Sequence, residues 1–281
     1  MLSATSGEQV PAVSEIGSAY AAAADAWAGG PSVIYQRLAD ALVGCAPSPL
    51  AGLRIADLGA GTGTVSRSLG DAGAQVVAFD LVAEMLDQGR GGRPPGAVAD
   101  VTALPVADDA VEGAVAAFVL NHLSRPASGL AEMGRVTRPG GMILASTFAQ
   151  QPRHPAKVAI DEVAARFGYR PPAWYEEMKA TVEPLSASAL RLTALAEQAG
   201  LVVVSVESRS VDVGADTAEV ITAYRLSMAQ VAPFVAGLSP DRRDALRAEA
   251  VAALGPDVEA MRPEVLFLVA RVPAPTTNAR R

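Results

Sequence analysis

Short apolar runs alternate along the chain with stretches whose apolar residues recur at helical spacing. Seven runs are short enough to be strands, and they occupy residues 53–58, 75–79, 97–100, 113–119, 142–148, 201–206 and 264–272. Helical spacing marks residues 15–43, 65–69, 81–86, 128–136, 158–167, 186–199, 218–238 and 242–254, and Gly29-Gly30-Pro31 divides the first of these into two helices. This alternation predicts an α/β fold, with a sheet covered by helices on both faces.

A glycine-rich turn follows the first apolar run. Its glycines are spaced Gly59-x-Gly61-x-Gly63 and let the backbone approach a ligand closely, because they have no Cβ. The helix that follows directs its free N–H groups at the turn. A dinucleotide site has Gly-x-Gly-x-x-Gly, so the third glycine here comes one residue early. Asp57 at the strand end suits an ammonium or sulfonium ligand better than a pyrophosphate, and an ordinary strand-to-helix turn is the alternative.

Asp80 stands at the end of the second apolar run. A carboxylate in that place can accept both ribose hydroxyls of an adenosine, as it does in NAD sites. Hydrogen bonds to a charged group contribute roughly 1.5–3 kcal/mol each. Asp80 therefore indicates an adenosine ligand without identifying which one, and a solvated acid at a strand end is the other interpretation.

Three segments resemble the class I S-adenosylmethionine (SAM) methyltransferases. Residues 57–63 (DLGAGTG) resemble the first motif of that family. Residues 100–105 (DVTALP) resemble its adenine segment, in which an aspartate meets the amino group and the next backbone N–H meets the ring. Residues 135–141 (RVTRPGG) match the run that turns the chain before the fifth strand. The resemblance implies a Rossmann-like, seven-stranded, mostly parallel sheet whose last strand is antiparallel beside the sixth, with a helical lid.

The same resemblance implies that SAM is the cofactor and that its methyl group passes to a nucleophile by in-line displacement. It covers residues 20–148 in motif detail and the remainder only by element order. Tyr20 is expected near the methionine end of the cofactor, with Trp27 a weaker candidate. The residues expected to bind the cofactor are Tyr20, Asp57, Gly59, Ala60, Gly61, Asp80, Leu81, Met85, Asp100, Val101 and Phe118.

Long segments that interrupt the core are expected to form a lid, because loops of this length are usually functional. The expected units are an N-terminal helical segment that forms part of the lid (1–50), a SAM-binding core (51–149), a lid insertion (150–187), a core helix and strand six (188–212), a helical lid insertion (213–262), the last core strand (263–273) and a tail (274–281). Residues 1–13 are expected to be poorly ordered. We expect two or three of Phe148, Tyr169, Trp174, Tyr175, Tyr224 and Met228 to line an apolar acceptor pocket, although each alone is also typical of a core.

The chain has only two histidines, and each is a candidate general base. His122 lies just past the fourth predicted strand, next to the expected methyl position, where the alternative is a residue that packs or hydrogen-bonds under the cofactor. His154 lies just past the fifth strand, where the alternative is a surface histidine between Pro152 and Pro155. A general base matters for a hydroxyl acceptor, where it accelerates the reaction roughly 100- to 10,000-fold.

Composition excludes several classes of function. The chain has 281 residues, a net charge of −7 and no basic cluster, which argues against a nucleic-acid substrate. A single cysteine and the absence of metal-ligand spacing predict no disulfide framework and no metal. No apolar run is long enough to span a bilayer, and the first residues lack a signal-peptide pattern, so we expect a cytoplasmic protein without membrane contact.

Several interpretations of the function stay open at this point. The first is a SAM-dependent methyltransferase for a small, fairly apolar molecule, with natural-product tailoring as an association only. The second is a non-methylating cyclase that binds SAM on the same fold, and the third, less favoured, is an NAD-dependent dehydrogenase. A purely binding or regulatory protein is a fourth. The sequence does not separate O-, N- and C-methylation, and it does not identify the acceptor or decide whether the chain forms a homodimer.

Overall fold

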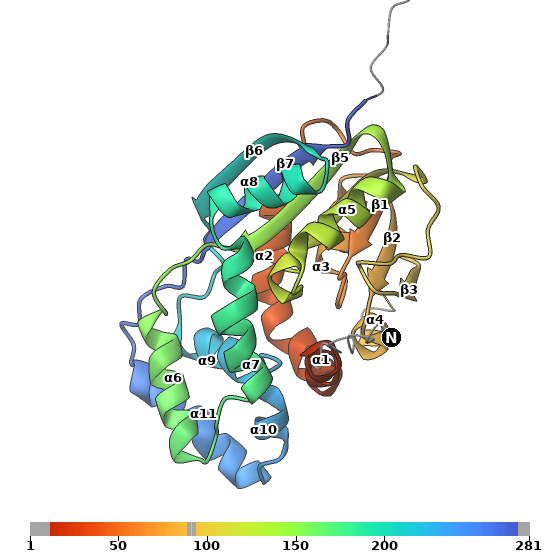
Figure 1. Cartoon of the computed structure of the whole chain (residues 1–281). Helices are drawn as coiled ribbons and strands as arrows, with labels where there is room; N and C mark the ends of the chain where they lie inside the picture. The colour runs from red at the N-terminus through yellow and green to blue at the C-terminus, as the bar shows by residue number, and fades with distance from the viewer. Residues whose placement is uncertain (1–11, 89–90, 92–93, 275–281) are drawn as a thin grey trace, which may run out of the picture.

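A seven-stranded sheet forms the core of the chain (Figure 1). The computed structural model describes residues 12–88, 91 and 94–274. The strands run in the order β3-β2-β1-β4-β5-β7-β6, with the bounds β1 Arg54–Leu58, β2 Gln75–Asp80, β3 Gly96–Val98, β4 Val111–Ala117, β5 Thr137–Phe148, β6 Val202–Ser210 and β7 Glu264–Arg271. Each strand lies at one of the seven apolar runs, so the predicted seven-stranded α/β sheet is confirmed.

The direction of the strands creates a ligand-binding edge. β1 pairs in parallel with β2 on one side and with β4 on the other, and β2–β3 and β4–β5 are also parallel. β7 is antiparallel to both β5 and β6, as predicted. Since the strand order reverses between β1 and β4, the carboxyl ends of these neighbours open a crevice of the kind in which α/β proteins bind ligands.

Helices cover both faces of the sheet and one end of it (Figure 1). Their bounds are α1 Ala12–Gly29, α2 Pro31–Val43, α3 Thr64–Asp71, α4 Ala83–Gln88, α5 Pro126–Val136, α6 Pro155–Arg166, α7 Ala173–Glu177, α8 Ala189–Gln198, α9 Ala218–Leu226, α10 Ala232–Ala236 and α11 Pro240–Leu254. Short turns of other helix types follow β4 and α7, namely η1 Leu120–His122, η2 Met178–Val182 and η3 Glu183–Ser186. The expected break between α1 and α2 is present. The expectation of poor order falls on residues 1–13, of which 1–11 lie outside the described residues and α1 begins at Ala12.

Two predicted boundaries were wrong for identifiable reasons. The predicted helix 218–238 is two helices, α9 and α10, because Pro233 lacks an N–H and cannot continue a helix from the preceding turn. The predicted turn before strand five lies inside β5. Thr137 pairs with Val111 and Met142 with Gly113, so the residues between them form a bulge, with Gly140 at φ +77°.

Apolar side chains form two layers, one on each face of the sheet. One layer joins Ile55 of β1 to Leu38 of α2 and Ile160 of α6. The other joins Leu58 of β1 to Leu130 of α5. Successive strand residues point to opposite faces, so a central parallel strand such as β1 is buried on both sides and holds the turn that follows it rigidly.

A second group of helices lies at one end of the sheet, away from β3 (Figure 1). It consists of α6 and α7, which follow β5, together with α9, α10 and α11, which come between β6 and β7. Segments far apart in the sequence therefore meet beyond the carboxyl ends of the central strands. Among the helices within the described ranges, none is both long and apolar enough to cross a membrane.

Candidate functional site

A cavity of about 360 Å³ opens at the carboxyl ends of β1, β2 and β4. Its wall consists mainly of residues at or after the ends of these strands and of β3, together with residues of α1, α2, α3 and α4. Ten of the eleven residues expected to bind the cofactor line it, namely Tyr20, Gly59, Ala60, Gly61, Asp80, Leu81, Met85, Asp100, Val101 and Phe118. The sequence motifs that were scattered over a hundred residues thus meet in one place.

Asp57 lies behind this wall and does not line the cavity. Its side chain is only 1% exposed, and its Oδ2 accepts a hydrogen bond of 2.6 Å from Ser66 Oγ. Ser66 is in the first turn of α3, so the pair ties the end of β1 to that helix. In this structure the Asp57 carboxylate holds the helix that follows the glycine turn, and its expected contact with the cofactor stays a prediction.

The glycine turn is held by the carboxylate at the end of β2. Gly59, Gly61 and Gly63 all have left-handed backbones, with φ of +65°, +54° and +87°. Asp80 Oδ2 accepts the Gly61 N–H at 2.8 Å, and its Oδ1 accepts the Val82 N–H at 2.9 Å. One carboxylate therefore fixes two backbone segments of the cavity, and its position at the cavity wall is determined by both.

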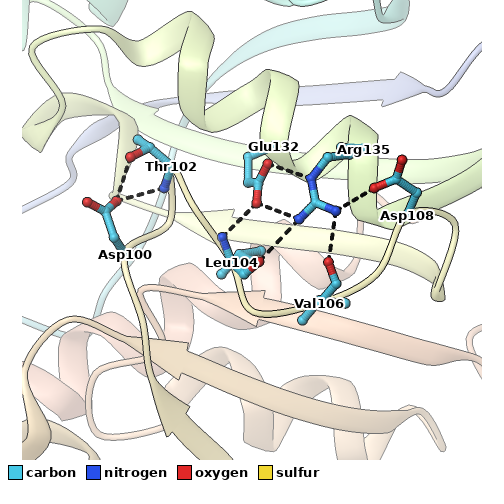
Figure 2. Close-up of polar contacts among 7 residues, drawn as sticks. All are labelled: Asp100, Thr102, Leu104, Val106, Asp108, Glu132 and Arg135. Atoms are coloured by element: carbon cyan, nitrogen blue, oxygen red, sulfur yellow. Dashed lines mark hydrogen bonds and ion pairs between the residues drawn. The ribbon is translucent and has the colours of Figure 1, made fainter.

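The loop after β3 brings Asp100 to the same cavity. Asp100 Oδ1 accepts two hydrogen bonds from Thr102, one from its N–H and one from its hydroxyl, each of 2.7 Å (Figure 2). These bonds form a local turn that fixes the side chain relative to its own backbone. Val101 lies within this turn and lines the cavity as well.

Arg135 on α5 anchors the rest of that loop, as Figure 2 shows. Its guanidinium donates to the carbonyls of Leu104 and Val106 at 3.2 and 2.8 Å and to Asp108 at 2.6 Å. Glu132 accepts the Leu104 N–H at 2.6 Å and two hydrogen bonds from Arg135 at 2.7 and 2.8 Å, and Arg135 lowers the pKa of the Glu132 carboxyl. Arg135 therefore positions the loop that carries Asp100, a role beyond the chain turn expected for this segment.

A continuous series of aromatic rings borders the cavity on the side of β4. Phe118 stacks on Phe148 with 4.4 Å between ring centroids, and Tyr35 meets Phe118 edge-on at 5.3 Å. Trp27 lies 5.1 Å from Tyr35 and 5.3 Å from Tyr20. Phe118 also has φ of +56°, a conformation that a bulky residue rarely adopts outside functional sites. Ring faces attract cations, so this cluster suits a positively charged group.

His122 lies at the end of η1, beside this cluster. Its Nε2 is 3.3 Å from the Tyr20 hydroxyl, and its Nδ1 is 3.1 Å from the Met178 sulfur. Burial lowers the pKa of His122 to about 4. The imidazole is therefore neutral at neutral pH, and a neutral ring can accept a proton and does not repel a cation.

The lowered pKa of His122 has a measurable effect on stability. An unfolded histidine titrates near pH 6.5. Between pH 6.5 and about 4, His122 is protonated in the unfolded chain but not in the folded chain. The stability that neutral His122 contributes is therefore fully present above pH 6.5 and is lost as the pH falls through about 4. When the pH falls from 7 to 4, we expect the free energy of unfolding of the wild type to decrease by about 2–3 kcal/mol more than that of His122→Gln.

Urea unfolding at both pH values measures this difference. His154→Gln is the matched control, because it replaces the other histidine of the chain. Equal acid sensitivity of the wild type and His122→Gln would show that His122 is not held neutral in the fold.

A second cavity, of about 310 Å³, lies beside the first and shares part of its wall. Tyr20, Tyr35, Asn121 and His122 line both cavities. Most of the rest of the second wall comes from the segment after β5, from α6 and α7, from the turns η2 and η3, from α9 and from the residues just before β7. The first cavity thus belongs to the sheet and the second mainly to the group of helices at its end.

Five of the six residues expected to contact an acceptor line the second cavity, namely Phe148, Trp174, Tyr175, Tyr224 and Met228. This is more than the two or three that we expected. Tyr169 does not line it. The side chain of Tyr169 is 3% exposed, and its hydroxyl donates to the Gln230 carbonyl at 3.2 Å. It packs beside Phe234, so its role is structural.

His154 lines the second cavity from the N-terminus of α6. Its Nδ1 accepts the Ala156 N–H at 3.2 Å, which caps the helix. A neutral ring that accepts at Nδ1 carries its proton on Nε2, so His154 is placed as a hydrogen-bond donor. Among the described residues, this buried Nε2 has no hydrogen-bond partner.

The sequence analysis missed three functional candidates in the second cavity, Tyr35, Lys157 and Arg225. Lys157 could have been found, because it lies one helical turn after His154 and is one of only two lysines in the chain. Tyr35 and Arg225 carry no such signal, since each occupies an ordinary position in a helical pattern. Within the described ranges, no cluster of His, Cys, Asp and Glu side chains is placed to hold a metal ion.

Comparison with known proteins agrees with this geometry. Residues 56–145 match the family model described as a methyltransferase domain. Residues 56–145 of the chain therefore form a methyltransferase domain. The matched residues run from β1 into β5 and include the glycine turn, Asp80 and Asp100. The predicted family of the core, and SAM as its cofactor, are thereby confirmed.

Curated relatives share part of this chain's sequence. The demethylmenaquinone methyltransferase of Renibacterium salmoninarum is 37% identical over 134 residues, which make up 47% of this chain and 55% of the relative. That of Beutenbergia cavernae is 42% identical over 106 residues, which make up 37% and 44%. The chain therefore spans only about half the length of the curated relatives it matches.

Solved structures share the fold over a longer stretch. The 4+2 cyclase SpnF has a TM-score of 0.54 at 20% identity, covering 85% of this chain and 81% of that chain. Phosphoethanolamine N-methyltransferase 2 of Haemonchus contortus, in complex with S-adenosyl-L-methionine, has a TM-score of 0.54 at 17% identity, covering 85% and 52%. These likenesses establish the fold of the core and of much of the helical group around it.

Proposed function

We propose that this chain transfers the methyl group of SAM to a small, fairly apolar acceptor bound in the second cavity. The observation that carries the proposal is the wall shared by the two cavities, formed by Tyr20, Tyr35, Asn121 and His122. A cofactor in the first cavity and an acceptor in the second would meet at this wall. Holding two reactants in line in this way contributes roughly 7–11 kcal/mol to lowering the barrier.

The residues of the first cavity fit SAM. Asp80, fixed by two backbone N–H groups, would accept the ribose hydroxyls, and Asp100 and Val101 would meet the adenine. The aromatic cluster around Phe118 suits the sulfonium, whose positive charge the ring faces attract. When bound, SAM supplies an electrophilic methyl group on a sulfonium that departs as a neutral thioether. The protein's own part is to hold both partners and to exclude water from between them.

The second cavity suits a ring-bearing acceptor. Phe148, Trp174, Tyr175 and Tyr224 present aromatic surface to it, and such surface binds flat apolar molecules. The matched relatives are named for demethylmenaquinone. The second cavity, however, consists mainly of residues after 145, outside the matched domain. We therefore propose only that the acceptor is a ring-bearing small molecule, and we do not assign the acceptor of these relatives to this chain.

We further propose that the helical segments 150–187 and 213–262 act as the lid over the acceptor. They supply Trp174, Tyr175 and Tyr224 to the second cavity, and they lie beyond the ends of the core strands (Figure 1). α1 contributes Tyr20 to both cavities and would close the cofactor site from the other side.

Calorimetric titration with SAM, S-adenosylhomocysteine and NAD, run in parallel, tests the cofactor part of this proposal. Binding of both adenosyl-sulfur ligands and not of NAD is the expected result. Acceptors with aromatic rings are then screened with radiolabelled SAM. Formation of S-adenosylhomocysteine in step with methylated product supports methyl transfer, whereas product without S-adenosylhomocysteine would favour a cyclase. Binding of NAD alone would contradict the proposal.

The two histidines make separate contributions under this proposal. For a hydroxyl acceptor found by the screen, His122→Ala is expected to lower turnover roughly 100-fold or more, because neutral His122 at the shared wall is placed to take the proton. His154→Ala is expected to weaken acceptor binding, because it removes a donor, with less than about a tenfold effect on turnover. Steady-state kinetics with titration of S-adenosylhomocysteine separates the two, and unchanged turnover in both variants would remove the general-base proposal.

A further inference from the structure

The wall of the second cavity carries more basic than acidic side chains, although the chain as a whole carries a net charge of −7. Five cationic side chains line the cavity, and Glu183 is the one carboxylate among its described lining residues. The cationic residues are Arg153, Lys157, Lys179, Arg225 and Arg262. A cavity of this composition attracts an anion, in contrast to a purely apolar acceptor pocket.

Four of these cations have carboxylate partners in the protein. Arg225 makes two hydrogen bonds of 2.7 Å to Asp161, which also pairs with Arg153. Lys179 donates to Glu183 at 2.6 Å. Arg262 lies 3.1 Å from Asp212. Three carboxylates therefore balance most of the charge of these four side chains, since Arg153 and Arg225 share Asp161.

Lys157 differs from the other four. Within the part of the chain that the structure describes, no carboxylate is paired with its ammonium. The ammonium lies over the Tyr224 ring, 5.4 Å from the ring centroid. Burial, together with the charges of Arg225, Lys179 and Arg153, lowers the pKa of Lys157 to about 8, with the Tyr175 side chain acting in the opposite direction. The Lys157 side chain is only partly exposed, and an ammonium held in a cavity wall without a counter-ion is less favourable than one that a ligand's negative charge balances.

The position of Lys157 relative to the shared wall indicates what kind of ligand the second cavity would bind. His122 and Tyr20 line both cavities, whereas Lys157 lines only the second. The aromatic side chains of Trp174 and Tyr175 line the same cavity. A molecule that reaches from the shared wall to Lys157 must therefore have an apolar body and an anionic group away from the reacting atom.

We propose that Lys157 is the anion-binding residue of the acceptor site and that the acceptor carries a carboxylate or a similar oxyanion on an aromatic frame. This inference rests on the proposed function and narrows its substrate class. A charge-assisted hydrogen bond from Lys157 to the oxyanion would orient the ring in the cavity. Uncharged ring compounds would then be poor acceptors, because they leave the ammonium in the cavity without a counter-ion.

Matched pairs of acids and amides test this inference. The protein, saturated with S-adenosylhomocysteine, is titrated by calorimetry with 1-naphthoate and 3-phenylpropionate and with the corresponding amides. In the wild type each acid is expected to bind roughly tenfold or more tighter than its amide, which corresponds to one charge-assisted hydrogen bond. Lys157→Met is expected to reduce that preference to about twofold or less. Arg247→Met, which removes an exposed cation of α11 that lines neither cavity, is the control and is expected to retain the preference.

A spectroscopic measurement reports on the same group directly. Because the chain has only two lysines, protein labelled with ¹³C-lysine gives two side-chain signals, and the Lys157→Met variant assigns them. Addition of 1-naphthoate is expected to raise the pKa of Lys157, since an anion stabilises the charged form.

The outcomes separate this inference from the proposed function. If S-adenosylhomocysteine binds but no acid binds better than its amide, the inference about Lys157 is overturned and the proposed cofactor site stands. The same holds if neither the acids nor the amides bind at all. An acid preference that survives in Lys157→Met, or a Lys157 signal that does not respond to a bound acid, also overturns it. If S-adenosylhomocysteine itself fails to bind, the proposed function fails instead.

Discussion

Asp80→Asn is expected to weaken the binding of SAM and S-adenosylhomocysteine by roughly 100-fold or more. The carboxylate of Asp80 accepts hydrogen bonds from the N–H groups of Gly61 and Val82 and, in the proposed complex, from the ribose hydroxyls. An asparagine presents an NH₂ group to some of these donors and removes the charge that strengthens each bond. The loss of two charge-assisted hydrogen bonds, at about 1.5–3 kcal/mol each, corresponds to this change in affinity.

Calorimetry with S-adenosylhomocysteine measures the effect without the need for an acceptor. Asp71→Asn is the matched control, because Asp71 is an exposed aspartate at the end of α3, outside the cavity, and its variant should bind normally. Thermal unfolding of both variants shows whether the glycine turn is intact. An affinity within about threefold of the wild type would mean that Asp80 only fixes the turn.

The second large effect is expected at Gly59. A Cβ at this position would lie 2.3 Å from Val119 Cγ2, and the backbone has φ of +65°. The left-handed conformation costs an alanine roughly 1–2 kcal/mol, and overpacking a rigid site costs about 1–3 kcal/mol. Gly59→Ala should therefore lower the free energy of unfolding by about 2–5 kcal/mol and displace the wall on which the cofactor rests.

Two comparisons separate the causes in urea unfolding. Gly52 has φ of +77°, and a Cβ added there would meet nothing within 4 Å, so Gly52→Ala should show only the conformational cost of about 1–2 kcal/mol. In a Val119→Ala background the clash disappears, and the cost of Gly59→Ala should fall to that of Gly52→Ala. If the cost is unchanged in this background, contact with Val119 is not what excludes a side chain at Gly59.

The sheet and the cofactor cavity were largely predictable from the sequence, because both depend on local features. The glycine turn, Asp80 and Asp100 each follow an apolar run, and parallel strands bring all three to one edge of the sheet. Asp57 shows the limit of that argument. Successive residues at a strand end point to opposite faces, so the pattern alone does not show that the Asp57 side chain meets Ser66 behind the cavity wall.

The second cavity was predictable only as a set of residue types. Its wall is assembled from helices whose relative positions depend on tertiary packing, so Trp174 and Tyr224 were candidates on the same grounds as Tyr169, which proved to be a core residue. Charge balance is also a property of the folded chain. Lys157 and Lys179 look alike in the sequence, and only the fold shows that Glu183 neutralises the second of them.

The place of β7 in the sheet also governs how this chain reaches its native state. β7 is the last strand in the sequence but lies between β5 and β6, and β6 pairs with no other strand of the sheet. Pairings between segments so distant along the chain form slowly, because a long loop must close first. Until β7 inserts, β5 presents an unpaired edge whose residues Met142 to Thr147 are destined for burial. Such an edge is a template for association between chains, so a folding chain is most prone to aggregate in the interval before its final strand docks.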